Sequence, residues 1–148
     1  MAKKAIVIFG SSTGNTELLA GAVEKGFKEG SFEVTTKNVA EVNPAQLRDY
    51  DLIAFGSSTW GDGELQADFI DFYEQLSADI LKEKKVCVFG PGDSSYEQFC
   101  KAIDLIEAKV KECGGQLAGK SFKVDGEIDP VLKDAQDWAR AIASSLPR

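Results

Sequence analysis

Short apolar runs alternate along this chain with segments in which apolar residues recur every three or four positions. The runs at residues 4–9, 51–56 and 85–90 are apolar almost throughout, which is typical of strands buried on both faces of a sheet. Residues 32–38 alternate between apolar and polar, as in a strand at the edge of a sheet. Residues 121–125 predict a short last strand.

The intervening segments predict helices over residues 15–29, 66–76 and 99–113 and from Pro130 onward. A proline suits the first turn of a helix because the amide hydrogen that it lacks would be unpaired there. The apolar residues expected on one face of each helix are, in chain order, Leu19, Val23 and Phe27; Phe69, Phe72, Tyr73 and Leu76; Phe99, Ile103, Ile106, Val110 and Cys113; and Val131, Ala135, Trp138 and Ile142.

Strands that alternate with helices predict an α/β fold, a three-layer sandwich in which helices cover both faces of a five-stranded parallel sheet. Right-handed connections and a central place for the most apolar strands favour the strand order 2-1-3-4-5, within one domain over residues 1–148. Ligands of such sheets bind beyond the carboxyl ends of the strands. Chemistry is therefore expected in the loops at residues 10–17, 56–68 and 90–99.

The composition removes several classes of function. The 148 residues include no histidine, which excludes Ser-His-Asp and Cys-His catalysis and histidine-ligated metals, and we predict no catalytic residue and no metal site. Cys87, Cys100 and Cys113 form no C-x-x-C pair, which favours reduced thiols. No apolar run approaches the roughly 20 residues of a membrane span, and the first residues do not resemble a signal peptide, so we expect a cytoplasmic protein.

The chain is acidic, with 17 basic and 24 acidic residues and a net charge of −7. Such a field repels nucleic acid and anionic membranes and favours partner proteins with a basic surface.

The first loop, Gly-Ser-Ser-Thr-Gly-Asn-Thr at residues 10–16, connects a strand to the beginning of a helix. Free backbone amides and the positive helix end point toward this position, and the hydroxyl side chains add donors, so the loop is suited to a phosphate. It is neither a Walker A loop, because it has no lysine, nor a G-x-G-x-x-G loop. The alternative is a turn whose polar residues only cap the helix.

The second and third loops each carry an aromatic residue among glycines and acids. Trp60 is difficult to bury in such a loop, which favours a ring that covers one face of a planar ligand. The alternative is a tryptophan that folds back on a helix. Tyr96 could cover the other face or be an exposed turn residue.

No Lys or Arg occurs in the three loops. A phosphate held by neutral donors alone indicates a permanent cofactor rather than a substrate that must leave. The acidic residues of these loops are Glu17, Asp62, Glu64, Asp68, Asp93 and Glu97.

Three ordered motifs resemble those of the flavodoxins, in their short-chain type, and the resemblance extends over essentially all 148 residues. The motifs are Ser-Ser-Thr-Gly-Asn-Thr at residues 11–16, Ser-Thr-Trp-Gly-Asp at 58–62 and Gly-Asp-Ser-Ser-Tyr at 92–96. The resemblance implies a flavodoxin-like fold with non-covalent FMN at the switch point of the sheet.

By this resemblance, residues 11–16 bind the FMN phosphate, Trp60 covers the inner face of the isoalloxazine ring and Tyr96 its outer face. The Gly61 carbonyl accepts the N5–H of the semiquinone. The cofactor-binding residues that the resemblance implies are Ser11, Ser12, Thr13, Gly14, Asn15, Thr16, Ser57, Ser58, Thr59, Trp60, Gly61, Asp62, Gly92, Asp93, Tyr96, Gln98, Phe99 and Cys100.

The implied function is that of a low-potential one-electron carrier, a monomer that cycles between semiquinone and hydroquinone without substrate turnover of its own. The acidic loops agree with this, since they disfavour the anion of the fully reduced flavin. The main alternative is a flavodoxin-like NAD(P)H-dependent quinone or flavin reductase. Cys100 could be read as a redox thiol, but a small buried side chain beside the flavin loop is favoured because no second thiol is close in sequence.

Overall fold

The computed structural model describes residues 3–10, 15–57, 59–60, 64–65, 67–92, 101–125 and 129–146, and the side-chain surroundings within 3–10, 16–57, 69–90, 103–124 and 129–146. The strands are β1 (Lys3–Gly10), β2 (Phe32–Asn38), β3 (Leu52–Ser57), β4 (Thr59–Trp60), β5 (Glu64–Leu65), β6 (Lys85–Gly92), β7 (Gln116–Leu117) and β8 (Phe122–Asp125). The α-helices are α1 (Asn15–Glu29), α2 (Ala67–Gln75), α3 (Ala78–Leu81), α4 (Lys101–Glu112) and α5 (Leu132–Ser145). The 3₁₀ helices are η1 (Val39–Glu41), η2 (Pro44–Asp49) and η3 (Asp129–Val131).

A parallel sheet with the order β2-β1-β3-β6 forms the centre of the molecule, and β7 and β8 pair with successive parts of β6. β7 lies beside Lys85 and Val86, whereas β8 lies beside the segment from Phe89 to Gly92. These two short strands therefore occupy the place of one interrupted fifth strand. The predicted order 2-1-3-4-5 is confirmed, and β4 and β5 form a separate antiparallel hairpin.

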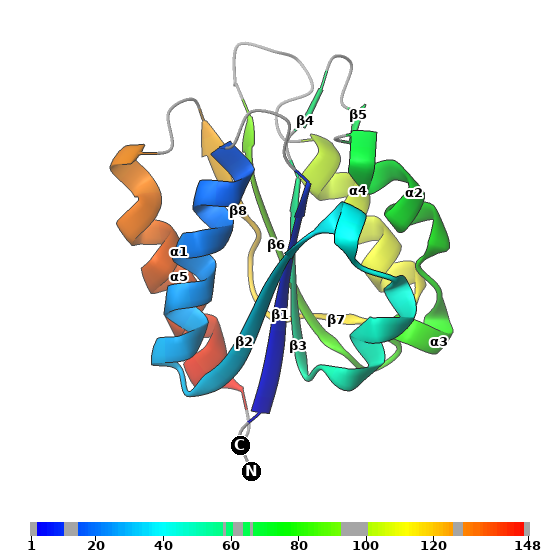
Figure 1. The fold of residues 1–148 in the computed structure, drawn as a ribbon, viewed down its shortest axis with the longest axis horizontal. Coiled ribbons are helices and arrows are strands. Elements are labelled where there is room, and N and C mark those ends of the chain that lie inside the picture. Colours follow the sequence, from blue (N-terminus) through cyan, green and yellow to red (C-terminus); the bar gives the residue numbers. More distant parts are fainter. Residues whose placement is uncertain are drawn as a thin grey trace.

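Helices cover both faces of the sheet, as Figure 1 shows: α1 and α5 on one face, and α2, α3 and α4 on the other. Alternate residues of β1 supply the two cores, with Val7 facing α1 and α5 and Ile8 facing the opposite layer. Neither face of such a strand contacts solvent, so apolar side chains are favoured at successive positions, which explains the unbroken apolar runs. Among the helices that the structure describes, none is long and apolar enough to cross a membrane.

Helices α1 and α5 touch closely through glycines at the C-terminal half of α1. A Cβ on Gly26 would lie 2.3 Å from the Gln136 carbonyl oxygen, and one on Gly30 would lie 2.3 Å from the Ala143 Cβ. Around Gly21, by contrast, nothing lies within 4 Å of such a Cβ. The contact thus opens toward the N-terminal end of α1, where Leu18, Gly21 and residues of α5 line a groove of about 390 Å³.

The segment between β2 and β3 contains η1 and η2, which the apolar pattern does not predict. Asn43 begins η2 with reciprocal capping bonds: the Asn43 side chain accepts a hydrogen bond from the Ala45 amide (3.0 Å), and the Gln46 side chain accepts one from the Asn43 amide (2.9 Å). Asparagine before Pro44 is the local signal for this turn. At the other end of the chain, Pro130 lies in η3, directly before α5.

One hydrogen bond ties α1 to the edge strand. The Thr36 hydroxyl donates to Glu24 Oε1 at 2.5 Å, and Lys28 donates to Glu24 Oε2 at 3.0 Å. The bond from Thr36 is the main cause that holds the pKa of Glu24 below its ordinary value, although partial burial acts in the opposite direction.

We expect Thr36→Val to raise the pKa of Glu24 and to make stability less dependent on acid. A depressed folded-state pKa contributes stability above the ordinary glutamate pKa of about 4.3, and this contribution is lost as pH falls through the lower folded value. The loss in unfolding free energy at pH 7 should be about 1 kcal/mol or less, because the hydrogen bond between Thr36 and Glu24 is only partly buried. Urea unfolding at pH 7 and pH 3 with carboxyl NMR titration measures both effects. Thr35→Val on the opposite face of β2 is the control, and an equal pKa change in both variants would contradict the assignment.

Candidate functional site

The carboxyl ends of β1, β3, β6 and β8 lie at one edge of the sheet, at the top in Figure 1 and opposite the marked chain ends. The connections from β1 and β3 lead to opposite faces of the sheet, since α1 lies on one face and α2 on the other. Adjacent parallel strands with diverging connections form the switch point at which ligands of doubly wound sheets bind. The predicted loops therefore start from this edge.

The predicted cofactor-binding residues divide into three groups. Those outside the described residues are Ser11, Ser12, Thr13, Gly14, Ser58, Gly61, Asp62, Asp93, Tyr96, Gln98, Phe99 and Cys100. Those described by their backbone alone are Asn15, Thr59, Trp60 and Gly92. Thr16 and Ser57 are described with their side chains.

Thr16 and Ser57 are the only buried polar residues in the part of the chain whose side chains are described, with exposed fractions of 1% and 0%. Burying a hydroxyl is unfavourable unless it is hydrogen-bonded, so an otherwise apolar core rarely contains one without a reason. Thr16 lies in the first turn of α1, and Ser57 is the last residue of β3. Both positions border the carboxyl edge, and both belong to loops expected to carry chemistry, Thr16 to the loop at residues 10–17 and Ser57 to the loop at residues 56–68.

The backbone around Ser57 is held closely between its neighbours. Gly10 is the register partner of Ser57 in β1. On the other side, a Cβ on Gly90 of β6 would lie 2.1 Å from the Ser57 carbonyl oxygen. Gly90 is not in the predicted set of cofactor-binding residues. Its position as the first glycine of the third loop is the sequence signal for a close approach of two backbones.

Helix α1 begins at Asn15, immediately after the predicted phosphate loop. The amides of a first helical turn have no partner within the helix, and the helix end carries a partial positive charge. A 15-residue helix beginning at the edge of the sheet suits an anion there. The described residues thus fit a phosphate-bearing group.

The second loop contains an antiparallel hairpin that places Trp60 opposite Glu64, and Thr59 opposite Leu65. The apolar pattern of the sequence does not predict this hairpin. The Asp62-Gly63 pair between the two short strands is the signal that could have predicted the hairpin. The pairing gives the backbone of the tryptophan segment a defined partner.

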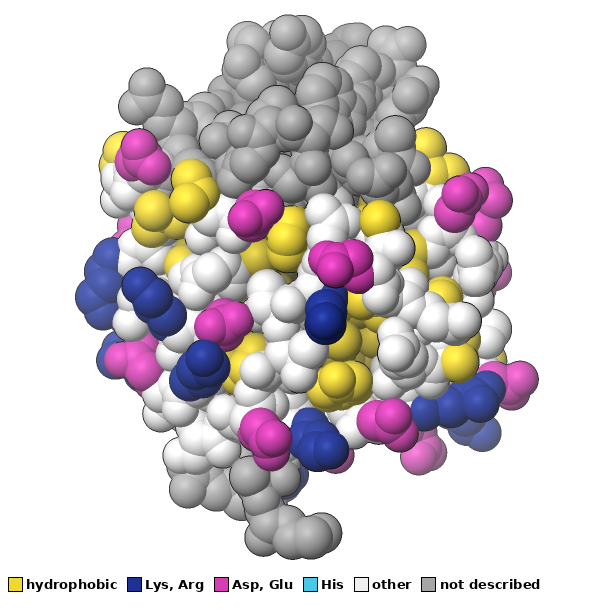
Figure 2. Space-filling model, viewed as in Figure 1, with side chains coloured by type: hydrophobic (Ala, Val, Ile, Leu, Met, Phe, Trp, Pro, Cys, Tyr) yellow, Lys and Arg dark blue, Asp and Glu magenta, His cyan; other side chains and the backbone are white. Residues whose placement is uncertain are grey.

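Acidic residues border the edge from several helices. Glu17, Asp104 and Asp134 lie in the first turns of α1, α4 and α5, whereas the last turns of α1 and α4 carry lysines. This arrangement complements the helix dipoles, and it also makes the carboxyl edge negative. On the face in Figure 2, the uppermost described charged side chains are acidic, and basic ones lie farther down.

Two described cations near this edge, Lys123 and Lys133, lie outside the three loops. Lys133, in the first turn of α5, pairs with Asp137 at 2.8 Å. Lys123 of β8 is the register partner of Gly90, and its ammonium group lies 2.8 Å from Asp104 Oδ1. Because β8 is distant from the loops in sequence, only the pairing with β6 brings this lysine to the site. The ion pair with Asp104 offsets its charge.

The described cysteines belong to the core rather than to the site. Cys87 in β6 is fully buried, and Cys113 after α4 is 5% exposed. Burial raises the pKa of both thiols, which disfavours the reactive thiolate.

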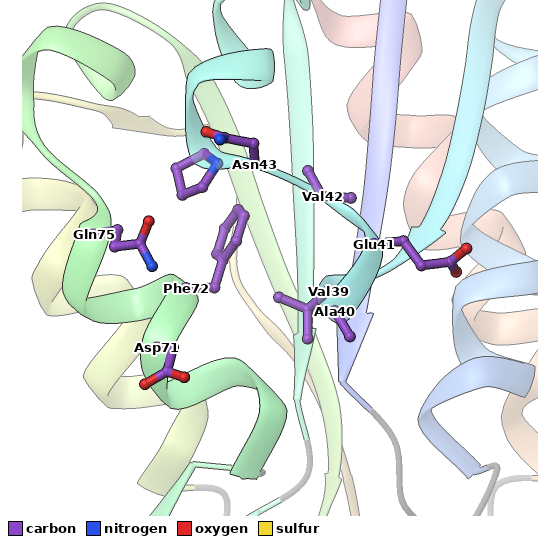
Figure 3. Close-up of a pocket in the computed structure, with 9 residues that line it drawn as sticks. Val39, Ala40, Glu41, Val42, Asn43, Asp71, Phe72 and Gln75 are labelled. Carbon is purple, nitrogen blue, oxygen red and sulfur yellow. The ribbon is translucent and has the colours of Figure 1, made fainter.

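Another pocket, of about 550 Å³, lies between α2 and the segment that contains η1 and η2. Figure 3 shows Asp71 and Gln75 on α2, and Val42 and Asn43 on the opposite wall. The polar residues of this pocket are exposed, and Asn43 is already used as a helix cap. We therefore assign no ligand to it.

Comparisons with known proteins agree with this geometry. The family model described as Flavodoxin matches residues 7–138. A flavodoxin from Maridesulfovibrio salexigens is 44% identical over 146 residues, which cover 97% of this chain and 99% of that protein. A probable flavodoxin 2 from Bacillus subtilis is 40% identical over 123 residues, 82% of each chain. The crystal structure of oxidised Flavodoxin 1 from Bacillus cereus superposes with a TM-score of 0.87 at 30% identity and covers 98% of this chain and 100% of that one.

Proposed function

Because this chain belongs to the flavodoxin family, we propose that it is a small electron-transfer protein that binds FMN at the carboxyl edge of its sheet. The observation that carries the proposal is the pair of buried hydroxyl residues, Thr16 and Ser57, at that edge. Thr16 lies where the loop proposed to bind the phosphate enters α1, and Ser57 lies where the loop proposed to bind the ring leaves the sheet, so their hydrogen bonds can fix one end of each loop.

We propose that residues 11–16 hold the phosphate and that residues 57–62 and 92–100 enclose the isoalloxazine ring. Thr16 would support the phosphate loop from the first turn of α1. Ser57 would fix the point at which the second loop leaves the sheet, and the β4–β5 hairpin would orient Trp60 against the ring. When bound, FMN supplies a ring that accepts and releases electrons, and the protein controls its surroundings.

The charges around the edge favour a low reduction potential. Negative side chains destabilise any additional negative charge, so a ring that gains electrons there must be reduced by a strong donor. Lys123 lessens this effect only in part, because Asp104 lies 2.8 Å from its ammonium group. This supports a low-potential one-electron carrier.

We propose a carrier without substrate turnover of its own, rather than an NAD(P)H-dependent reductase. Support for the carrier comes from two flavodoxin relatives, which this chain covers over 99% and 100% of their own length. An NAD(P)H oxidation assay with a quinone distinguishes them, and steady turnover by the purified protein would favour the reductase.

The partners proposed are redox proteins with basic surfaces. Acids border the edge, and the exposed large apolar side chains of the described chain, Leu18 (53%) and Ile70 (37%), lie near the starts of α1 and α2. A docking face with an apolar contact and an acidic border fits a partner with an apolar contact inside a basic border. We further propose a cytoplasmic monomer of one domain that does not bind nucleic acid, in keeping with the net charge of −7.

An anaerobic reductive titration followed by visible absorbance tests the function. We expect a yellow protein that takes up its two electrons in separate one-electron steps. Trp60→Ala should weaken FMN binding by about tenfold or more, since stacked aromatic contacts contribute about 1–3 kcal/mol each. Tyr50→Ala, just before the amino end of β3, is the control aromatic variant. Direct bleaching in one two-electron step would favour the reductase, and a protein that FMN cannot colour would refute the proposed site.

A further inference from the structure

We propose that Phe89 is a positioning residue for the flavin site, whose ring sets where β3 leaves the sheet and so where the second loop begins. The inference rests on the proposed function, since the loop that it positions is the one assigned to the ring of FMN. Phe89 belongs to none of the three motifs, and it does not lie in the predicted set of cofactor contacts.

A single row of residues crosses the sheet directly below the site. The strand register aligns Phe9 of β1, Gly56 of β3, Phe89 of β6 and Phe122 of β8. Three of these positions carry a phenyl ring on the face covered by α1 and α5. The fourth, Gly56, carries no side chain, although it lies in the middle of the row.

The ring of Phe89 occupies the space that Gly56 leaves. A Cβ on Gly56 would lie 2.3 Å from Phe89 Cζ and 2.4 Å from Cε2, so the tip of the ring lies against the backbone of Gly56. The Phe89 side chain, from the neighbouring strand, therefore limits how far the backbone of β3 at Gly56 can move toward α1 and α5. Dense packing transmits a change in such a contact rather than absorbing it.

The Phe89 ring is held in place by aromatic neighbours. Its centroid lies 6.4 Å from that of Trp138 in an edge-to-face contact, and Trp138 contacts Phe122 at 5.5 Å. The Trp138 indole donates a hydrogen bond to the Lys120 carbonyl at 2.8 Å. Phe89 is fully buried, so the ring has no solvent-filled space into which it could turn.

The next row of residues across the sheet, toward the loops, contains Ser57, Gly10 and Gly90. Gly56 precedes Ser57 directly, and the Ser57 carbonyl lies against Gly90. A shift of Gly56 toward α1 and α5 would therefore also displace Ser57, the next residue along the chain and a buried residue of the proposed flavin site. Trp60 follows only three residues after Ser57.

The test replaces Phe89 by leucine and uses Phe27→Leu as the matched control. Phe27 is also fully buried, in the same core layer, but it belongs to α1 and contacts Phe32 at the amino end of β2. Both variants should unfold at lower urea concentration, because both lose a buried ring. Only Phe89→Leu should raise the FMN dissociation constant, by about tenfold, and shift the reduction potentials of the bound flavin.

Amide hydrogen exchange on the purified protein without added FMN gives an independent reading. Phe89→Leu should accelerate exchange at Ser57 and Gly90, and Phe27→Leu should not. Trp138→Phe removes the indole hydrogen bond and should change affinity and exchange in the same direction but less, which keeps the test available if Phe89→Leu does not fold.

Equal changes in FMN affinity and potential for the two leucine variants would overturn the positioning role, as would unchanged exchange at Ser57 in Phe89→Leu and in Trp138→Phe. A wild-type protein that does not bind FMN would refute the proposed function instead. In that event, the exchange experiment would still decide whether Phe89 fixes the end of β3.

Discussion

Gly26→Ala is expected to lower the unfolding free energy by about 3 kcal/mol, whereas Gly21→Ala in the same helix should raise it by about 0.5–1 kcal/mol. At Gly26 the new methyl group would lie 2.3 Å from the Gln136 carbonyl oxygen, 2.6 Å from the Ala139 Cβ and 2.8 Å from the Arg140 amide nitrogen. Two of these atoms belong to the backbone of α5, so α1 and α5 must move apart to admit it. Around Gly21 the methyl group meets nothing, and the better helix propensity of alanine remains.

Urea unfolding of the two variants, followed by circular dichroism, measures this difference directly. Both variants replace glycine by alanine in α1, so the gain in helix propensity is the same for both. Only the contact with α5 differs between them. Equal stability of the two variants would show that the helices are not packed through Gly26.

Gly90→Ala is expected to affect both the fold and FMN binding. The added Cβ would lie 2.1 Å from the Ser57 carbonyl oxygen and 3.3 Å from Ile103 Cδ1, so β3 and α4 leave it no room. Overpacking of this kind costs about 1–3 kcal/mol of unfolding free energy. Because the atom that must yield is the backbone of Ser57, we also expect FMN affinity to fall by about tenfold or more.

The control for Gly90→Ala is Gly119→Ala. A Cβ on Gly119 would lie 3.4 Å and 3.5 Å from atoms of Ile142, which is close to ordinary contact. Gly119→Ala should therefore leave FMN affinity unchanged within about twofold. Fluorescence titration with FMN and urea unfolding give both quantities, and normal FMN affinity in Gly90→Ala would show that the Ser57 carbonyl can move without consequence for the site.

The periodicity of the sequence predicted the main elements well because most of this fold is buried by regular structure. Helix α1 and strand β2 have the predicted bounds, and β3 and α2 differ from prediction by one residue at each end. The apolar faces predicted for the helices lie in the two cores wherever they are described, with Tyr73, Val131 and Trp138 at the margins. Phe99 lies outside the described residues.

Short elements were not predicted because their signals are local turns rather than periods. The capped turn after Asn43, the two-residue strand β7 and the hairpin at Trp60 are each shorter than the window in which a period can be recognised. Pairing also decided how the fifth strand is built, since β7 and β8 are joined into one edge only by β6.

Three motifs in the sequence predict the site and its ligand class, because a phosphate loop and stacked aromatic side chains need particular residue types at consecutive positions. What the sequence determined by itself is therefore what depends on neighbours along the chain: the strands, the helices, the negative charge and the three loops. The tertiary structure alone decided what depends on neighbours in space. It brings Lys123 beside Gly90, places Phe89 over Gly56 and closes α5 against Gly26. Each of these contacts joins strands or helices that are distant in the chain, and no periodicity or motif records which glycine will face a partner and which will face open space.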